Sequence, residues 1–244
     1  MSPFLAALGL LTRVPIPSFF PSPTPMDLGR SALFFPVVGF LIGVLLALLG
    51  EAMALPGREG LAAALLLTGW VVITGGLHLD GLADCADAWI GGMGSREKTL
   101  AILKDSRSGP AAISAMVLVL LLKYSAIKIV LVAGAAWWLI WPAMLGRSVM
   151  LFLMRSTPYV RAQGMGRGHA DHLPRRFSWI VLLLVAMSAL IWPVGQAAVL
   201  TALLMGWGLR GAFLARLGGW SGDALGASCE LTEAAVLVVL VFTL

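Results

Sequence analysis

The sequence predicts an all-α integral membrane protein, a single polytopic domain over residues 1–244 with about seven transmembrane helices. Apolar residues make up 59% of the chain and charged residues only 12%, about half the charge of an ordinary soluble domain. The mean hydropathy is +0.94. Several apolar runs approach the roughly 20 residues that a helix needs to cross a hydrocarbon core of about 30 Å. These observations exclude a soluble globular class.

The N-terminal segment, residues 1–30, precedes the first candidate span. Its apolar run Phe4–Leu11 is too short to cross a bilayer and predicts an interfacial or re-entrant helix. The prolines between Pro15 and Pro25 predict an irregular connector, because proline breaks helices. The predicted spans are Ser31–Leu49, Gly60–Leu79, Pro110–Leu131, Ala135–Met154, Trp179–Trp192, Gln196–Arg210 and Leu231–Leu244. The last of these reaches full length only if its helix begins near Asp223.

The distribution of Lys and Arg predicts the orientation. Thirteen of the seventeen lie in the N-terminal segment, the segment 75–109, the loop 155–177, and the end of the sixth span with the following loop 211–230. The opposite side carries only Arg58. Because cytoplasmic loops are enriched in Lys and Arg, the thirteen-residue side is predicted to be cytoplasmic. In such a chain the net charge of +5 reports orientation and does not indicate nucleic-acid binding.

Residues 75–109 form a polar segment in this apolar chain, which we call the acidic segment. Three of its carboxylates, on Asp80, Asp84 and Asp87, are spaced i, i+4, i+7, so a helix would place them on one face. Like charges at that spacing repel, and a cation would compensate them. Mg²⁺ is usually held by one or two carboxylates plus substrate phosphate oxygens. Basic residues that suit phosphate follow directly; they are Arg96, Lys98, Lys104 and Arg107.

The acidic segment is therefore predicted to be a metal–phosphate site at a membrane surface. The alternative is that Asp84 and Asp87 are solvated charges on a loop helix. Asp80 argues against it, because an acid directly after a long apolar run is costly and is by default a functional hypothesis.

Two further polar segments belong to the same predicted side. The glycine-rich segment Gly218–Glu233 contains Asp223, Glu230 and Glu233. It predicts either a second metal or nucleotide shelf or a helix N-terminus whose dipole favours acids. The basic segment Tyr159–His172 predicts either a phosphate-binding loop or a flexible cytoplasmic loop.

Two cations lie well inside predicted spans. For Lys123 and Arg147 an ion pair with an acid across the bundle is favoured over contact with substrate. The two cysteines, Cys85 and Cys229, form no CxxC pair and are predicted to be free thiols.

The motifs GGLHLDGLADCADAW, LKDSRSG and GGWSGDALGA occur in this order, after an N-terminal LTRVPIP and FFPVVGFLIG. Together they resemble the cobalamin synthase family, the adenosylcobinamide-GDP ribazoletransferases, over nearly the whole chain. The resemblance implies a membrane enzyme that requires Mg²⁺. Such enzymes join adenosylcobinamide-GDP to α-ribazole, or to its 5′-phosphate, and release GMP. Cys85 departs from the small polar residue expected at that position, but the flanking acids are in place.

The resemblance also implies roles for individual residues. Asp80, Asp84 and Asp87 would be catalytic, with Asp87 either the proton acceptor or a third metal ligand. The full set of candidate metal ligands is Asp80, Asp84, Asp87, Asp223, Glu230 and Glu233. The candidate substrate- and phosphate-binding residues are Lys104, Asp105, Arg107, His78 and Arg147. The expected partners are the two small-molecule substrates and membrane lipids, and a homo-oligomer is compatible with the sequence. The expected location is a bacterial inner membrane, with the N-terminus and the active-site loops cytoplasmic.

Two other functions share single features with this sequence. The DGxAD pattern is faintly similar to the DGxxAR motif of the CDP-alcohol phosphotransferases, but the arginine of that motif is Asp84 here. A transporter would use Asp80, Lys123 and Arg147 as a coupling network. It predicts an inverted repeat, which the sequence does not show.

Overall fold

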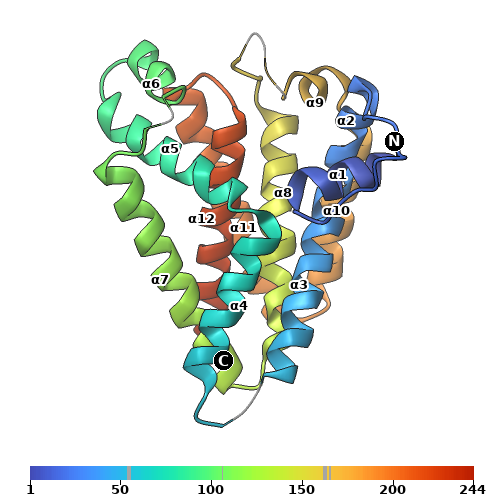
Figure 1. The fold of residues 1–244 in the computed structure, drawn as a ribbon, viewed down its shortest axis with the longest axis vertical. Coiled ribbons are helices and arrows are strands. Elements are labelled where there is room, and N and C mark those ends of the chain that lie inside the picture. Colours follow the sequence, from blue (N-terminus) through green and yellow to red (C-terminus); the bar gives the residue numbers. More distant parts are fainter. Residues whose placement is uncertain (54–55, 106, 162–163, 165) are drawn as a thin grey trace.

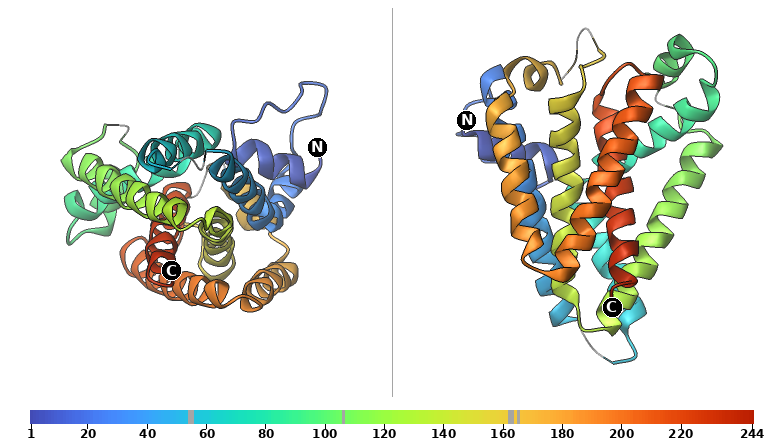
Figure 2. Two further views of the ribbon diagram at one scale, coloured as in Figure 1. Left: turned by 90° about the horizontal axis from the view of Figure 1, so that it is seen from below. Right: turned by 180° about the vertical axis from the view of Figure 1, so that it is seen from behind.

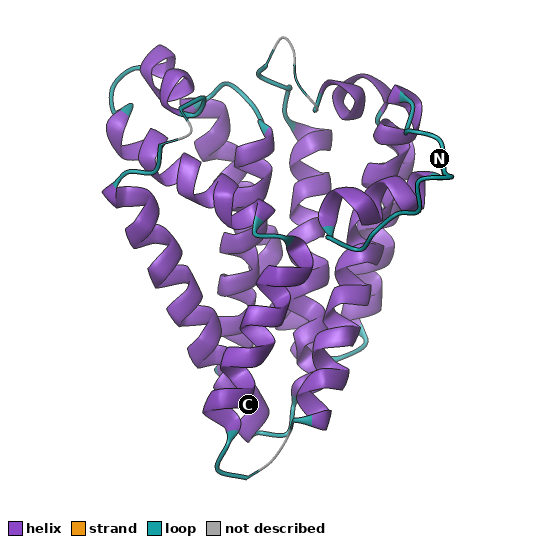
Figure 3. Cartoon of the chain, in the orientation of Figure 1, coloured by secondary structure: helices purple, strands orange, loops and turns teal. Residues whose placement is uncertain are grey.

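Every regular element is a helix in the part of the chain that the computed structural model describes, residues 1–53, 56–105, 107–161, 164 and 166–244 (Figure 3). The elements are α1 (Pro3–Leu11), α2 (Pro25–Ser31), η1 (Ala32–Phe34), α3 (Phe35–Ala52), α4 (Glu59–Thr74), α5 (Leu77–Gly91), α6 (Arg96–Ile102), α7 (Pro110–Val132), η2 (Ala136–Leu139), α8 (Ile140–Ser156), α9 (Arg167–His172), α10 (Arg175–Leu190), α11 (Pro193–Arg216) and α12 (Gly222–Val241). The all-α prediction is confirmed.

Five helical stretches among the described residues are long and apolar enough to cross a membrane. They are Pro25–Ala52, Pro110–Val132, Ala136–Ser156, Pro193–Arg216 and Gly222–Val241. A sixth results if α4 and α5 together form one bent span. The prediction of about seven spans is therefore too high. The predicted span Trp179–Trp192 corresponds to α10, which is only 16 residues long and begins with two arginines.

The predicted span Gly60–Leu79 was wrong at its end. Helix α4 stops at Thr74, and α5 then leaves at 88° to it. The turn uses Gly75 and Gly76, whose φ angles of 64° and 67° lie in the left-handed region that glycine adopts without steric cost. Hydropathy alone runs smoothly through this turn, because Leu77 and Leu79 continue the apolar pattern. The bend directs the acidic segment away from the axis of α4.

The last span begins at Gly222, so the full-length alternative for the seventh predicted segment is confirmed. The hydroxyl of Ser221 accepts a hydrogen bond from the backbone N–H of Ala224, which caps the helix. Residues 12–24 contain no helix, as the prolines predicted, and α1 covers the short N-terminal apolar run.

Helices α8 and α12 form the centre of the bundle. In the span that ends with α8 and in α12, 72% of the most apolar 18 residues are buried, whereas only 28% are buried in α11. The other long helices surround this pair (Figure 2). Helices α5, α6 and α9 gather at one end of the molecule, and the C-terminal ends of α3 and α7 lie at the other (Figure 1). The predicted polar segments thus share one end, which we call the polar end.

Candidate active site

Helix α5 carries the three predicted carboxylates. The predicted helix is confirmed over Leu77–Gly91, with Asp80 exposed and Asp84 and Asp87 half-buried. Asp84 experiences electrostatic repulsion from Asp80, Asp87 and Asp223, and attraction from Arg161. The structure therefore brings the acids of α5 together with the first acid of α12.

A close approach of two backbones places α5 against α12. A Cβ atom built on Gly81 would lie 2.7 Å from the backbone oxygen of Asp223, closer than any side chain tolerates. On the other helix, a Cβ on Gly226 would lie 3.2 Å from the backbone of His78. Glycine at these two positions lets the acidic face of α5 lie directly beside the N-terminus of α12.

Asp87 has a role that spacing did not reveal. Its carboxylate accepts hydrogen bonds from the backbone N–H groups of Gly109 and Ala112, the latter at 2.9 Å. These groups belong to the first turn of α7, whose N-cap residue is a glycine without a side-chain acceptor. Unsatisfied N–H groups at a helix start bind carboxylates well. Asp87 thus caps α7 from another helix and fixes α5 to it.

Arg161 forms an ion pair with Asp223 and donates a second hydrogen bond to the backbone oxygen of Leu103, at 3.2 Å. One guanidinium therefore connects the segment after α8, the start of α12 and the end of the acidic segment. Beside it, Tyr159 and Trp220 pair as an isolated bridge, with ring centroids 4.5 Å apart. Residues 162, 163 and 165 of the predicted phosphate loop lie outside the described residues.

The predicted phosphate-binding residues at the end of the acidic segment are accessible. Lys104 is exposed, and the Arg107 side chain is 88% exposed. The side chain and the backbone N–H of Arg107 hydrogen-bond to Asp105, which lowers the pKa of that carboxyl to about 2. Asp105 is therefore ionised near neutral pH, and it orients Arg107 at the polar end.

Glu230 and Glu233, predicted as candidate metal ligands, lie in a buried ion cluster instead. Lys123 of α7 contacts both carboxylates, with 2.8 Å between Lys123 Nζ and Glu230 Oε2, and Arg147 of α8 contacts Glu233. His78 completes the cluster, its Nδ1 lying 3.4 Å from the Arg147 guanidinium. The prediction that Lys123 and Arg147 pair with acids across the bundle is confirmed. Two cations neutralise two anions here, which leaves no excess negative charge to attract a metal.

Three carboxylates from two helices are available to a divalent cation at the polar end. They belong to Asp80 and Asp84 on α5 and to Asp223 on α12. In the described part of the chain, no group of three His, Cys, Asp or Glu side chains is arranged to hold a metal ion. The carboxylate chemistry fits Mg²⁺, which commonly takes one or two protein carboxylates and completes its shell with phosphate oxygens and water.

An apolar groove of about 720 Å³ borders another face of α5, between α7, α11 and α12. Leu82, Cys85 and Trp89 line it from α5. Cys85 is a buried free thiol, so its departure from the expected residue type changes the groove wall and leaves the carboxylates unaltered.

Two contacts of this site did not follow from the sequence. Arg161 lies in the glycine-rich basic segment that predicted either a phosphate-binding or a flexible loop, and nothing in that segment indicated its pair with Asp223. The capping of α7 by Asp87 had a weak signal, a predicted Gly109–Pro110 helix start that lacks a capping side chain of its own.

Comparison with known proteins places this chain in a family. A profile of cobalamin-5-phosphate synthase matches residues 3–241. An adenosylcobinamide-GDP ribazoletransferase of Pseudomonas paraeruginosa is 50% identical over 238 residues, which covers 97% of this chain and 96% of the relative. The proteins of the same name from Pseudomonas syringae and Pseudomonas aeruginosa PAO1 are 48% and 49% identical, over 98% and 97% of this chain and 99% and 96% of their own length. No solved structure matches the chain significantly. The chain belongs to the cobalamin-5-phosphate synthase family.

Proposed function

We propose that this protein is an adenosylcobinamide-GDP ribazoletransferase, which joins adenosylcobinamide-GDP to α-ribazole or its 5′-phosphate and releases GMP. The observation that carries the proposal is the similarity of about 50% over nearly the full length of three relatives with that name. The convergence of acidic and basic side chains at one end of a membrane bundle supports it. Family membership also disfavours the CDP-alcohol phosphotransferase and transporter alternatives.

The reaction forms one phosphorus–oxygen bond and breaks another. A ribose hydroxyl of the ribazole that is free in both acceptors, and therefore not the 5′-hydroxyl, attacks the phosphorus attached to cobinamide, and the bond from that phosphorus to the GMP oxygen breaks. The hydroxyl proton passes to a base. Because the reacting groups carry negative charge, positioning and electrostatic stabilisation dominate such a transfer.

Asp80 and Asp84 would hold Mg²⁺ against the pyrophosphate, with Asp223 next to them. When bound, Mg²⁺ supplies charge neutralisation at the phosphate oxygens and at the leaving GMP. Lys104 and Arg107 would bind phosphate oxygens, with Asp105 orienting Arg107. Arg161 would hold Asp223 and the end of the acidic segment in place.

Asp87 is our proposed proton acceptor. Its carboxylate uses two of about four lone-pair positions on the α7 backbone, which leaves acceptor capacity for the ribazole hydroxyl. Both its attachment to α7 and its place on the acidic face support a fixed position near the acceptor.

We propose that the polar end faces the cytoplasm of a bacterial inner membrane. The thirteen Lys and Arg residues of the basic side support this orientation. The proposed substrates are large, charged and water-soluble, so an aqueous face suits them.

The function is tested with the protein purified in detergent. Supplied with adenosylcobinamide-GDP, α-ribazole and Mg²⁺, it should release GMP and form a complete corrinoid in equal amounts, measured by chromatography. GMP release without the joined product would contradict the transferase proposal, since it would indicate hydrolysis.

A further inference from the structure

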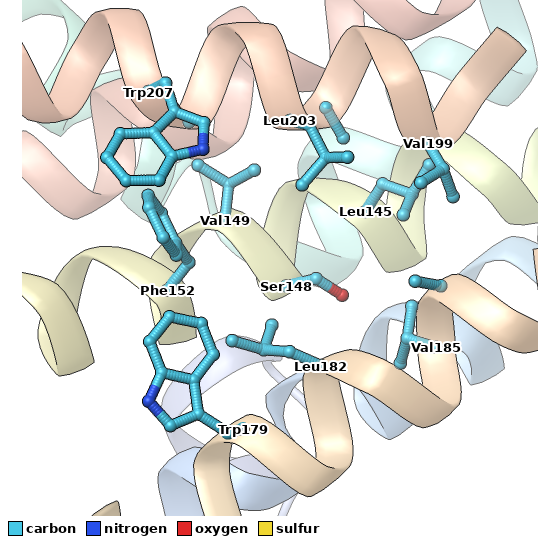
Figure 4. A pocket seen from close by; sticks show the side chains of 13 residues that line it. Leu145, Ser148, Val149, Phe152, Trp179, Leu182, Val185, Val199, Leu203 and Trp207 are labelled. Atoms are coloured by element: carbon cyan, nitrogen blue, oxygen red, sulfur yellow. The ribbon is translucent and has the colours of Figure 1, made fainter.

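A second apolar cavity lies away from the acidic helix, between α8, α10 and α11. Its volume is about 170 Å³. Phe152, Trp179 and Trp207 stand along one side of it, and leucine and valine side chains close the remainder (Figure 4). The hydroxyl of Ser148 already donates to the backbone oxygen of Met144, at 2.8 Å. The walls of the cavity are therefore mainly apolar and suit a hydrocarbon.

Two arginines border this cavity. The guanidinium of Arg155 lies 5.4 Å from the ring centroid of Trp179, and that of Arg210 lies 5.3 Å from the ring of Trp207. Arg210 also donates to the backbone oxygen of Ser156, which places it next to Arg155 in space. No carboxylate among the described residues pairs with either guanidinium. Two positive charges thus lie together at the rim without a counter-ion from the chain.

The cavity borders an exposed apolar surface of the bundle. Helices α8 and α11 are candidate spans, and α11 is the least buried of the five. Trp207 is 58% exposed and Leu203 52% exposed, on a surface that faces hydrocarbon if the bundle crosses the membrane. The rim arginines lie at the ends of α8 and α11 nearest the polar end (Figure 1), where phospholipid headgroups would be found.

We propose that this cavity binds an anionic phospholipid, with one acyl chain between α10 and α11 and the phosphate at Arg155 and Arg210. The apolar walls match the chain, and the two uncompensated guanidinium groups match an anionic headgroup. Trp179 and Trp207 lie between the apolar cavity and the two arginines. Tryptophan is commonly found at such a boundary between apolar and polar surroundings at membrane interfaces. An acyl chain seated here contacts α8, α10 and α11 together.

The test is native mass spectrometry of the detergent-purified protein with phosphatidylglycerol or phosphatidylcholine added at equal concentration. The wild type should retain phosphatidylglycerol in preference. Replacing Arg155→Gln and Arg210→Gln should weaken its retention by about fivefold for each arginine and leave phosphatidylcholine unchanged. Arg167→Gln is the matched control, because Arg167 is an exposed α9 arginine paired with Asp171.

A second variant tests the cavity without changing charge. Ala186 lines the cavity, and Ala186→Leu should occupy it and reduce retention of both lipids, while the melting temperature confirms folding. Equal retention of both lipids by the wild type, or arginine variants that behave as Arg167→Gln does, would overturn the proposal. So would a dimer mass that disappears in Ala186→Leu, since a second copy would then occupy this face. Should the arginine double variant fail to fold, unchanged lipid retention by Ala186→Leu alone would still overturn it.

Discussion

Arg147 of α8 and Glu233 of α12 form an ion pair in which neither side chain has any exposed surface. The pair joins the two central helices of the bundle. Lys123 binds the same glutamate from α7, and His78 contacts the arginine from α5. The cluster is therefore a direct connection between the core and the helix that carries the proposed catalytic acids.

The first prediction concerns charge balance in this cluster. Glu233→Gln leaves two buried cations facing one carboxylate, and removing one partner of a buried pair typically costs about 3–5 kcal/mol. Arg147→Met leaves the opposite excess. The double variant restores neutrality, because Lys123 keeps Glu230. Melting temperatures in detergent should therefore fall sharply in each single variant and recover in part in the double variant, a non-additivity of the kind that marks direct contact. Additive losses would show that the side chains act independently.

The sequence predicted the positions of the helices better than the contacts between them. Span positions follow from local composition, so most helices were predicted well, but the 88° turn at Gly75–Gly76 interrupts a run that is apolar on both sides. Intramembrane charges predicted that Lys123 and Arg147 have acidic partners. They could not show that Glu230 and Glu233 are those partners, because the pairing depends on how α7, α8 and α12 pack. The capping of α7 by Asp87 likewise joins residues 22 or more positions apart.

The second prediction concerns the proposed metal site. Asp80→Asn or Asp84→Asn should abolish transfer, with a loss of at least about 10³-fold, because a bound metal typically contributes several kcal/mol to transition-state stabilisation. The measurement is GMP release by purified variants across a Mg²⁺ titration. Asp171→Asn is the matched control, since it breaks only an exposed pair with Arg167. Near-normal turnover by either α5 variant at ordinary Mg²⁺ would reject the metal role.

The third prediction concerns phosphate binding by Arg107. Arg107→Gln should raise KM for adenosylcobinamide-GDP by roughly 10- to 100-fold, because hydrogen bonds to charged groups are worth about 1.5–3 kcal/mol. The effect on kcat should be smaller. Arg107 is exposed and paired only with Asp105 among the described residues, so the melting temperature should not change. An unaltered KM with a normal Arg167→Gln control would remove Arg107 from the binding site.

The fourth prediction concerns orientation. Ser95 lies between α5 and α6 at the polar end, whereas Arg58 lies at the opposite end. In intact bacterial cells, Ser95→Cys should be protected from a membrane-impermeant thiol reagent and Arg58→Cys should be labelled. The two native cysteines are buried and give a low background. Labelling of position 95 from outside, with position 58 protected, would invert the topology.

The fifth prediction concerns Asp87, for which three roles must be separated. If Asp87 accepts the ribazole proton, Asp87→Asn should lower kcat by about 10²–10⁴-fold and leave the Mg²⁺ requirement unchanged. If it is a metal ligand, excess Mg²⁺ should restore part of the rate. If its only role is to cap α7, the loss of activity in Asp87→Asn should parallel a loss of stability. The two carboxylate oxygens of Asp87 accept from Gly109 and Ala112, and the NH₂ group that replaces one of them in asparagine cannot accept a hydrogen bond.

A capping control separates the third role from the other two. Thr24→Ala removes the side-chain cap of α2 at a cost of about 1 kcal/mol and leaves every proposed catalytic carboxylate in place. It should lower the melting temperature because a helix cap is lost. At a temperature where the protein is folded, kcat should change little. Asp87→Asn should lose far more activity than Thr24→Ala at a comparable melting temperature. Equal activity losses in the two variants would reduce Asp87 to a structural residue, and rescue by Mg²⁺ would place it among the metal ligands.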